Sequence, residues 1–311
     1  MTQMRDHGGG LDAAIATYGG TREGWLDLST GINPVPYPMP QLPTDSMTAL
    51  PDKAAFEKLY QRARNFWRIP DDAAIIGAAG ASAIIAGLPH VIPPGDICIP
   101  GPTYNEHGAA FQAAGWTLGQ DPGHGFVAVH PNNPDGILWD PKQIEAPYRI
   151  IDESFCDVVP DQSLIDLTNQ PGIIVLKSFG KFWGLAGLRL GFAIGDPVII
   201  ARLTELLGPW QISGPALAIG AEALADPQWA DETRERLTAD AVRLDALVTA
   251  NGAELIGGTT LFRLYMVKDA AAAQAHLAQS HVWSRVFPYA PDWLRLGLPA
   301  SDRWGQLEAA F

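Results

Sequence analysis

From about residue 53, stretches with helical periodicity alternate with short apolar runs that Gly, Pro or Asp residues bound. The helical stretches are residues 53–67, a segment from about Ser82, and 106–114. The apolar runs are residues 73–76, 97–99, 116–118, 126–129, 149–151, 173–176 and 190–193. Apolar runs of about four residues, buried on both faces, are typical of a parallel sheet that helices cover. The pattern therefore predicts an α/β domain.

After Pro215 the pattern changes. Two long helical stretches precede a strand pair around 260–267 and 294–298, with a further helix at 270–279 between the two strands. The long stretches are residues 216–225 and 229–250. This order predicts a second, smaller α+β domain.

One stretch, residues 34–43, is too rich in Pro to form a helix or a central strand, and it is the expected linker. We therefore expect an N-terminal arm over 1–40 that contributes to the small domain and the substrate site. A large α/β domain is expected over 41–215 and a small α+β domain over 216–311.

The net charge of the chain argues against two classes of binding partner. The chain has 21 Lys and Arg against 34 Asp and Glu, which gives a formal net charge of -13. Nucleic acids and anionic membranes are poor partners for such a protein, because both attract the opposite charge. The longest uncharged stretch, residues 73–95, is interrupted by Gly and Pro, so we expect no membrane span. The first 30 residues contain no apolar block typical of a secretory signal, and a cytoplasmic location is expected.

Cysteine and histidine usage gives no sign of a metal site. Cys98 and Cys156 are the only cysteines, and both lie in apolar, strand-like surroundings. The histidines show no ligand spacing. We expect two reduced core cysteines and assign no metal.

The segment from Lys177 to Phe192, KSFGKFWGLAGLRLGF, follows a predicted strand and carries Lys181 and Arg189 among small and apolar residues. Desolvation lowers the pKa of a lysine and makes its amine a nucleophile suited to Schiff-base chemistry. The alternative is a surface turn in which Lys177 and Lys181 are both solvated. A P-loop is excluded, because Phe182 follows the Gly-Lys pair.

Two other segments carry candidate chemistry, and a third has the composition of a turn. Asp152 ends a predicted buried strand, where a carboxylate needs a cationic partner, and a pyridinium nitrogen would satisfy it. The small residues of 77–82 lie between a strand and a helix, where backbone N–H groups at a helix start can receive a phosphate. Residues 130–136 form a turn by composition alone.

Together these residues resemble the fold-type-I pyridoxal-phosphate enzymes of the class I/II aminotransferase superfamily. The match rests on SFGKFWGLAGLRLGF, which is similar to that family's SxSK…GLRLGY signature. The resemblance implies a large domain with a mostly parallel seven-stranded sheet between helices, pyridoxal 5'-phosphate as cofactor, and a homodimer with its sites at the interface.

The resemblance also assigns roles to individual residues. It makes Lys181 the lysine that binds the cofactor, Asp152 the acid on the pyridine nitrogen, and Tyr104 the ring stacked on the cofactor; these three are the expected catalytic residues. The other implied cofactor ligands are Gly80, Ala81, Ser178 and Arg189 for the phosphate, Asn133 for O3′, and His107 behind the aspartate. Arg295 matches the arginine that binds the substrate carboxylate.

The chain ends resemble a narrower family, the threonine-phosphate decarboxylases. HGGG at residues 7–10 and DLSTGINP at 27–34 are similar to that family's HGGN…DxSxNINP, and segments 208–213 and 284–286 also match. The resemblance implies that His7 and Arg285 bind a substrate phosphate, with Gly31 and Asn33 also on the substrate side. It implies decarboxylation of L-threonine O-3-phosphate to 1-amino-2-propanol phosphate, a step of cobalamin biosynthesis.

The sequence departs from these patterns at four places. The superfamily's Tyr-Pro-Asp is Leu50-Pro51-Asp52, the hydroxyl residue before the lysine is Gly180, and Asn of HGGN is Gly10. Only 18 residues separate Asn133 from Asp152. This connection is shorter than the family usually has, so the resemblance predicts that one helix there is trimmed.

Two other functions stay open at this point. One is an aminotransferase on a phosphorylated amino alcohol such as histidinol phosphate, although Phe155 stands where those enzymes usually have Tyr. The other is a non-catalytic scaffold built on the same fold.

Overall fold

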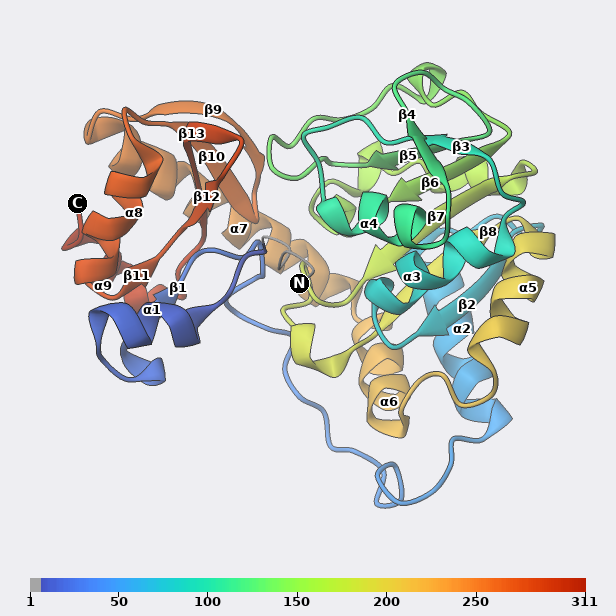
Figure 1. Cartoon of the computed structure of the whole chain (residues 1–311). Coiled ribbons are helices and arrows are strands. Elements are labelled where there is room, and N and C mark those ends of the chain that lie inside the picture. Colours follow the sequence, from blue (N-terminus) through green and yellow to red (C-terminus); the bar gives the residue numbers. More distant parts are fainter. Residues whose placement is uncertain (1–6) are drawn as a thin grey trace. The chain divides into compact units, whose positions relative to one another are not determined.

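The computed structural model describes residues 7–311. The chain divides into two compact units: unit 1 holds the residues up to Val35, Pro134–Gly136 and Glu232–Phe311, and unit 2 holds Pro36–Asn133 and Ile137–Asp231 (Figure 1). These boundaries differ from the expected ones at residues 40 and 215.

The difference at residue 215 has a packing reason. Helix α6 (Gly214–Ala223) lies against α2 (Lys53–Trp67), where Gly220 approaches Leu59 closely and Lys58 pairs with Glu222 at 2.8 Å. Burial of this helix face stabilises α6 within unit 2, although the sequence pattern groups it with the helices that follow.

Unit 2 is built on a seven-stranded sheet with the order β2-β8-β7-β6-β5-β3-β4. Its strands are β2 (Ala74–Ala78), β3 (Asp96–Cys98), β4 (Thr117–Gly119), β5 (Gly125–Val129), β6 (Tyr148–Asp152), β7 (Ile173–Ser178) and β8 (Gly191–Gly195). β8 runs antiparallel to both of its neighbours, β2 and β7, and the other six strands run in one common direction. The predicted α/β class and its mostly parallel seven-stranded sheet are confirmed.

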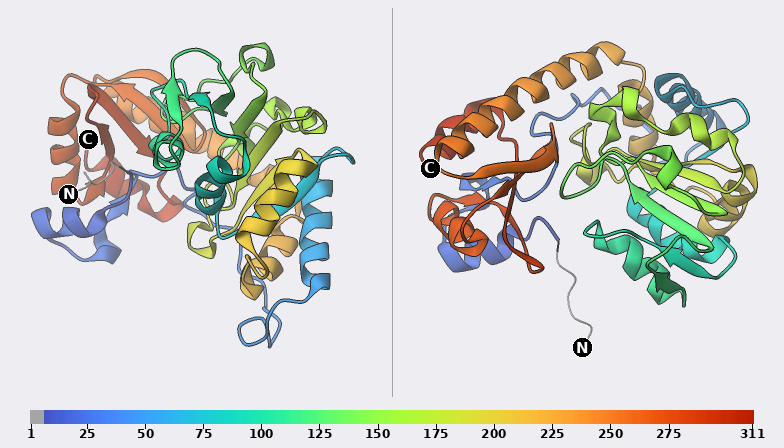
Figure 2. Two further views of the ribbon diagram at one scale, coloured as in Figure 1. Left: turned by 45° about the vertical axis from the view of Figure 1, so that its right-hand side comes forward. Right: turned by 90° about the horizontal axis from the view of Figure 1, so that it is seen from above.

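Helices cover both faces of this sheet (Figure 2). Besides α2 and α6 they are α3 (Ala81–Val91), α4 (Asn105–Ala113) and α5 (Pro197–Leu207). Helix α5 was not among the expected elements, although Asp196 caps it by accepting hydrogen bonds from the N–H groups of Val198 and Ile199. Between β5 and β6 the only helical segment is a 3₁₀ helix at Pro141–Gln143, so the helix expected to be trimmed is indeed absent there.

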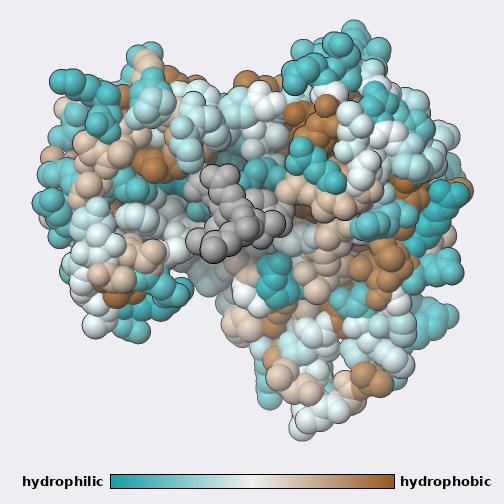
Figure 3. All heavy atoms as spheres, in the orientation of Figure 1, coloured by the Kyte–Doolittle hydropathy of each residue, from teal (hydrophilic) through white to brown (hydrophobic). Residues whose placement is uncertain are grey.

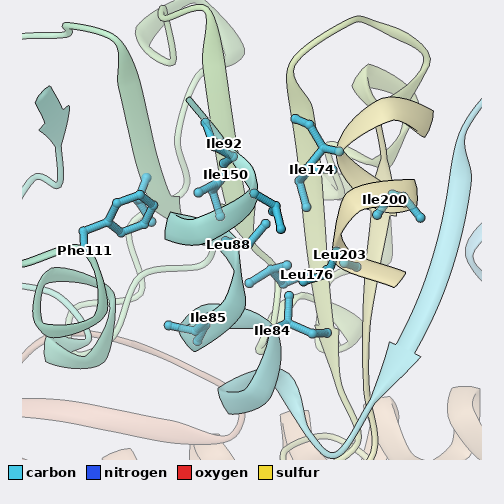
Figure 4. Close-up of a cluster of buried hydrophobic side chains, with 14 of the residues drawn as sticks. Ile84, Ile85, Leu88, Ile92, Phe111, Ile150, Ile174, Leu176, Ile200 and Leu203 are labelled. Carbon is cyan, nitrogen blue, oxygen red and sulfur yellow. The ribbon is translucent and has the colours of Figure 1, made fainter. Parts of the chain in front are cut away.

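Side-chain alternation along the strands sorts the core into two layers. Ile174 and Leu176 of β7 point toward α3 and α5, where they pack with Ile84 and Leu203 (Figure 4). On the other face, Phe192 of β8 meets Trp67 of α2 with ring centroids 5.1 Å apart. Successive residues at a strand end therefore project to opposite faces, which matters for the site described below.

Unit 1 contains a four-stranded antiparallel sheet with the order β12-β13-β10-β9. Its strands are β9 (Glu254–Thr259), β10 (Phe262–Met266), β12 (Arg285–Phe287) and β13 (Ala290–Gly297). Its helices are α1 (Leu11–Tyr18), most of α7 (Pro227–Ala250), α8 (Ala270–Gln279) and α9 (Trp304–Glu308). A parallel pair of short strands, β1 (Leu26–Asp27) and β11 (Val282–Trp283), joins the N-terminal segment to the C-terminal part of the chain.

The surface view in Figure 3 shows hydrophobic residues scattered among hydrophilic ones. Within residues 7–311, no helix combines the length and the apolar character needed to cross a bilayer. Cys98 and Cys156 are buried and form no disulfide, as predicted.

Candidate active site

The carboxyl ends of β6 and β7 present the first group of predicted residues. Asp152 is the last residue of β6 and Ser178 the last of β7, and the register places Asp152 beside Leu176. The Asp152 carboxylate is buried and accepts hydrogen bonds from the N–H (3.0 Å) and Oγ (2.5 Å) of Ser154, while its other oxygen lies 2.8 Å from Nε2 of His107. Burial raises the pKa of Asp152, but the bonds and charge of His107 and the Ser154 bonds outweigh it and hold the pKa below its ordinary value.

Helix α4 brings two further predicted residues to Asp152. Tyr104 precedes the first residue of α4, and His107 lies in its first turn with its ring centroid 6.1 Å from that of Tyr104. Nδ1 of His107 is buried and has no hydrogen-bond partner among residues 7–311. The His107 ring therefore contacts both Tyr104 and Asp152.

The structure distinguishes the two lysines of the signature segment. Lys177 is fully buried and its Nζ lies 2.6 Å from a Glu153 carboxylate oxygen. Burial alone lowers the pKa of Lys177, but Glu153 and Asp157 raise it above the ordinary value, so this amine stays protonated and is no nucleophile. The alternative in which Lys177 is a solvated surface residue is therefore wrong.

Lys181 lies in the turn that follows β7, and it is half-buried. Its Nζ lies 5.1 Å from the centroid of the Phe155 ring, and Phe155 follows Asp152 by three residues. Of the two lysines, Lys181 is the one that lies beside the end of β6 without being buried in an ion pair with Glu153.

The predicted phosphate ligands come together at the start of α3. Gly80 caps α3 with φ 82°, and a Cβ atom there would collide with the guanidinium of Arg189. Ser178 pairs with Gly191, which pairs in turn with Ala78, and a Cβ at Gly191 would collide with the backbone nitrogen of Ala81. A phosphate group is bound by backbone N–H groups at a helix N-terminus, by hydroxyl groups and by arginine. The start of α3, Ser178 and Arg189 supply these three features.

Asn133 lies just beyond β5 and is half-buried. Its neighbour Asn132, to which the sequence assigned no role, is buried and links this turn to the segment before α4. The Asn132 side chain accepts a hydrogen bond from Thr103 Oγ1 (2.6 Å) and donates one to the Pro102 carbonyl (3.0 Å). Because both asparagines occupy one Asn-Asn-Pro turn, composition alone gives no signal that separates them.

Unit 1 holds the predicted substrate residues. Arg285 of β12 and Arg295 of β13 are directly paired across the two strands. Arg295 is buried, donates from Nη2 to the Ser29 carbonyl (2.6 Å), and places its guanidinium over the Phe262 ring. Burial, and then the charge of Arg285, lower the pKa of Arg295 to about 9. Two like charges that face each other across neighbouring strands destabilise the sheet. A bound anion would relieve this repulsion, so such a pair is expected at an anion-binding site.

A cavity of about 390 Å³ lies beside this pair within unit 1, and His7, Ser29, Trp283 and Arg285 help to line it. Nη1 of Arg285 donates to the His7 carbonyl at 2.6 Å, and Nε1 of Trp283 donates to the Gly9 carbonyl at 2.9 Å. The His7 segment is thereby held next to β12. The structure brings the two predicted phosphate ligands to one cavity.

Gly31 and Asn33 lie elsewhere in unit 1. Both are buried, and neither lines that cavity. Oδ1 of Asn33 accepts hydrogen bonds from Arg236 (2.7 Å) and from the Val35 N–H (3.1 Å). This oxygen therefore fixes the segment before Val35 to α7.

One cluster has the residue types of a metal site. The donor atoms of His130, Glu153 and Cys156 lie within 4.8 Å of one another and are buried. However, the His130 ring accepts from the Trp139 N–H and donates to the Gln162 carbonyl, and Glu153 already binds Lys177. The three residues serve as polar contacts of the core.

Comparison with known proteins identifies the family of this chain. A threonine-phosphate decarboxylase of Pseudomonas aeruginosa is 36% identical over 99% of this chain and 97% of its own length. One from a Sinorhizobium species is 37% identical over 96% of this chain and 95% of its own length. The sequence profile of the "Aminotransferase class I and II" family matches residues 117–309.

The chain belongs to the class I and II aminotransferase family. The resemblance drawn from the signature segment is confirmed. A solved histidinol-phosphate aminotransferase from Sinorhizobium meliloti, in complex with pyridoxal-5'-phosphate, has a TM-score of 0.80, covers 97% of this chain and 93% of its own, and is 14% identical. That likeness shows the shared fold.

The residues of unit 2 fit the cofactor of this family. The α3 start, Ser178 and Arg189 offer donors for a phosphate, the buried ionised carboxylate of Asp152 suits a protonated ring nitrogen, and Lys181 supplies an amine. The cofactor candidates all lie in unit 2 and the substrate candidates all lie in unit 1.

Proposed function

We propose that this chain is a pyridoxal-phosphate-dependent carboxy-lyase that converts L-threonine O-3-phosphate to 1-amino-2-propanol phosphate in cobalamin biosynthesis, as a homodimer in the cytoplasm. The observation that carries the proposal is the cross-strand pair of Arg285 and Arg295 next to a cavity lined by His7. A substrate with two anionic groups, a carboxylate and a phosphate, suits two neighbouring guanidinium groups. The two relatives named threonine-phosphate decarboxylase support this substrate.

When bound, pyridoxal phosphate supplies an electron sink for the bond that breaks at the substrate Cα. Asp152 keeps a proton at the ring nitrogen, because its carboxylate is ionised and buried. His107 and Ser154 hold that carboxylate in one orientation. Lys181 provides the amine for covalent attachment, and Tyr104 provides an aromatic face for the ring.

The arginines orient the substrate. Arg295 binds the carboxylate, while Arg285 and His7 bind the phosphate, so the substrate is held at two points. Two anchors restrict rotation about the bond between the amino nitrogen and Cα, and this rotation decides which substituent of Cα is lost. The second anchor is therefore what favours loss of CO2 over amino transfer.

Product analysis tests the reaction. Purified enzyme loaded with cofactor should release CO2 and 1-amino-2-propanol phosphate from threonine phosphate at equal rates with and without a 2-oxo acid. Amino transfer that needs the oxo acid and yields no CO2 would favour the aminotransferase instead. If neither product forms, the scaffold function replaces both.

We expect a dimer in solution. Met39, Met47 and Leu50, all on the segment before α2, are 63%, 75% and 64% exposed, and Trp210 is 52% exposed. Burial of such residues stabilises an obligate interface. Sedimentation equilibrium should give about twice the 33.4 kDa mass of one chain at micromolar concentration. A monomer that binds one full equivalent of cofactor would contradict the dimer.

A further inference from the structure

A buried ionic network lies behind the cofactor candidates of unit 2. Nζ of Lys177 lies 2.6 Å from Glu153 and 3.6 Å from Asp157, and all three side chains are at most 4% exposed. Asp157 also accepts hydrogen bonds from the indole N–H groups of Trp67 (2.9 Å) and Trp183 (3.0 Å). None of these groups is used in the reaction described above.

The position of the network along the strands is informative. Glu153 directly follows Asp152, and Lys177 directly precedes Ser178. Because successive strand residues project to opposite faces, the ion pair sits on the α2 side while Asp152 and Ser178 project to the other side. On the α2 side of the sheet, the ring centroid of Trp67 lies 5.7 Å from Nζ of Lys177.

The ion pair also joins two strands where their pairing ends. The last register pair between β6 and β7 is Asp152 with Leu176, and one further backbone bond runs from the Glu153 N–H to the Leu176 carbonyl (3.0 Å). Beyond it, the Lys177–Glu153 contact is the side-chain link between the two strand ends. Glu153 is itself fixed by Ser163 Oγ (2.6 Å) and by the N–H of Leu164 (2.5 Å).

Energetics argue against stability as the reason for the pair. Burying two charges costs more free energy than their attraction returns in many proteins, and neutral groups of similar volume often serve as well. A buried pair next to the reacting groups is better explained by the geometry that it imposes.

We propose that Lys177 and Glu153 are positioning residues, which lock the ends of β6 and β7 so that Asp152 keeps its place relative to Ser178 and Lys181. The inference rests on the proposed cofactor site. It assigns the ion pair no contact with substrate or cofactor. Its effect passes through the position of the Asp152 carboxylate, and therefore through the protonation of the ring nitrogen.

The test uses the double variant Lys177→Met/Glu153→Gln. This change removes one positive and one negative charge, so the net charge of the network is unchanged and the field at Asp152 is altered little. We expect the apo double variant to unfold within a few degrees of wild type, yet to bind pyridoxal phosphate about tenfold or more weakly. The pH at which the visible absorption of the bound cofactor changes should move by about one unit.

Three comparisons make the test decisive. Lys177→Arg should stay within about threefold of wild-type affinity, because it keeps the charge that Glu153 binds. The matched control Arg263→Met/Asp245→Asn removes an ion pair of 2.8 Å in unit 1 and should leave cofactor affinity unchanged. Ser163→Ala removes one bond to Glu153 and should weaken cofactor binding about two- to fivefold.

Each outcome is informative. Wild-type affinity and an unchanged pH profile in the double variant would overturn the positioning role while the proposed function stands. If the double variant does not fold, Ser163→Ala decides, and wild-type affinity there contradicts the proposal. A wild-type protein that binds no pyridoxal phosphate would instead remove the proposed function itself.

Discussion

Replacement of Lys181 by alanine is expected to eliminate covalent binding of pyridoxal phosphate and to lower the decarboxylation rate below detection. Lys181 is the lysine of the signature segment that lies beside Phe155 and the end of β6, whereas Lys177 is held protonated by Glu153. An amine that stays protonated cannot form a covalent bond to an aldehyde. The measurement is the visible absorption of the protein–cofactor complex, followed by borohydride treatment and peptide mass analysis.

The control for this prediction is Lys142→Ala, which removes an exposed lysine from the 3₁₀ helix at Pro141–Gln143. It should retain the wild-type spectrum and the borohydride-fixed label on Lys181. If Lys181→Ala still carries a reducible cofactor, or if the label maps to Lys177 in the wild type, the assignment of the lysine is wrong.

Arg285→Ala is expected to reduce kcat/KM for threonine phosphate by about ten- to a hundredfold. A charge-assisted contact to a phosphate contributes about 1.5–3 kcal/mol, and loss of that contact is felt in the transition state if the phosphate anchor orients Cα. Unphosphorylated threonine should be processed at nearly the same low rate by the wild type and the variant. Steady-state kinetics with both substrates measures the difference.

Arg243→Ala is the matched control, since Arg243 is also an arginine of unit 1 but pairs with Glu308 at 2.6 Å and lies over the Trp304 ring. Its kcat/KM for threonine phosphate should equal that of the wild type. If Arg285→Ala lowers kcat/KM equally for threonine and threonine phosphate, Arg285 does not bind the phosphate. The residue that binds the phosphate would then have to lie elsewhere.

The sequence by itself determined the large features of the fold. Runs of apolar residues bounded by Gly, Pro or Asp gave the seven strands of unit 2 to within about two residues, because most side chains of these strands are buried and most buried side chains are apolar. The segment from Lys177 to Phe192, together with Asp152 and residues 77–82 and 130–136, carried the resemblance to the family, which the comparisons confirm. Helix α5 was missed because its apolar positions directly follow the run of β8.

Tertiary structure decided how neighbouring residues differ in role. The sequence does not distinguish Lys177 from Lys181, or Asp152 from Glu153. Because side chains alternate along a strand, Asp152 contacts His107 whereas Glu153 contacts Lys177.

Arg285 and Arg295 are ten residues apart in the chain, and only the register of β12 and β13 places them opposite each other. Likewise, only packing assigns α6 to unit 2. Sequence patterns report which residues are buried, whereas register and face depend on contacts between segments far apart in the chain, and no local pattern encodes those.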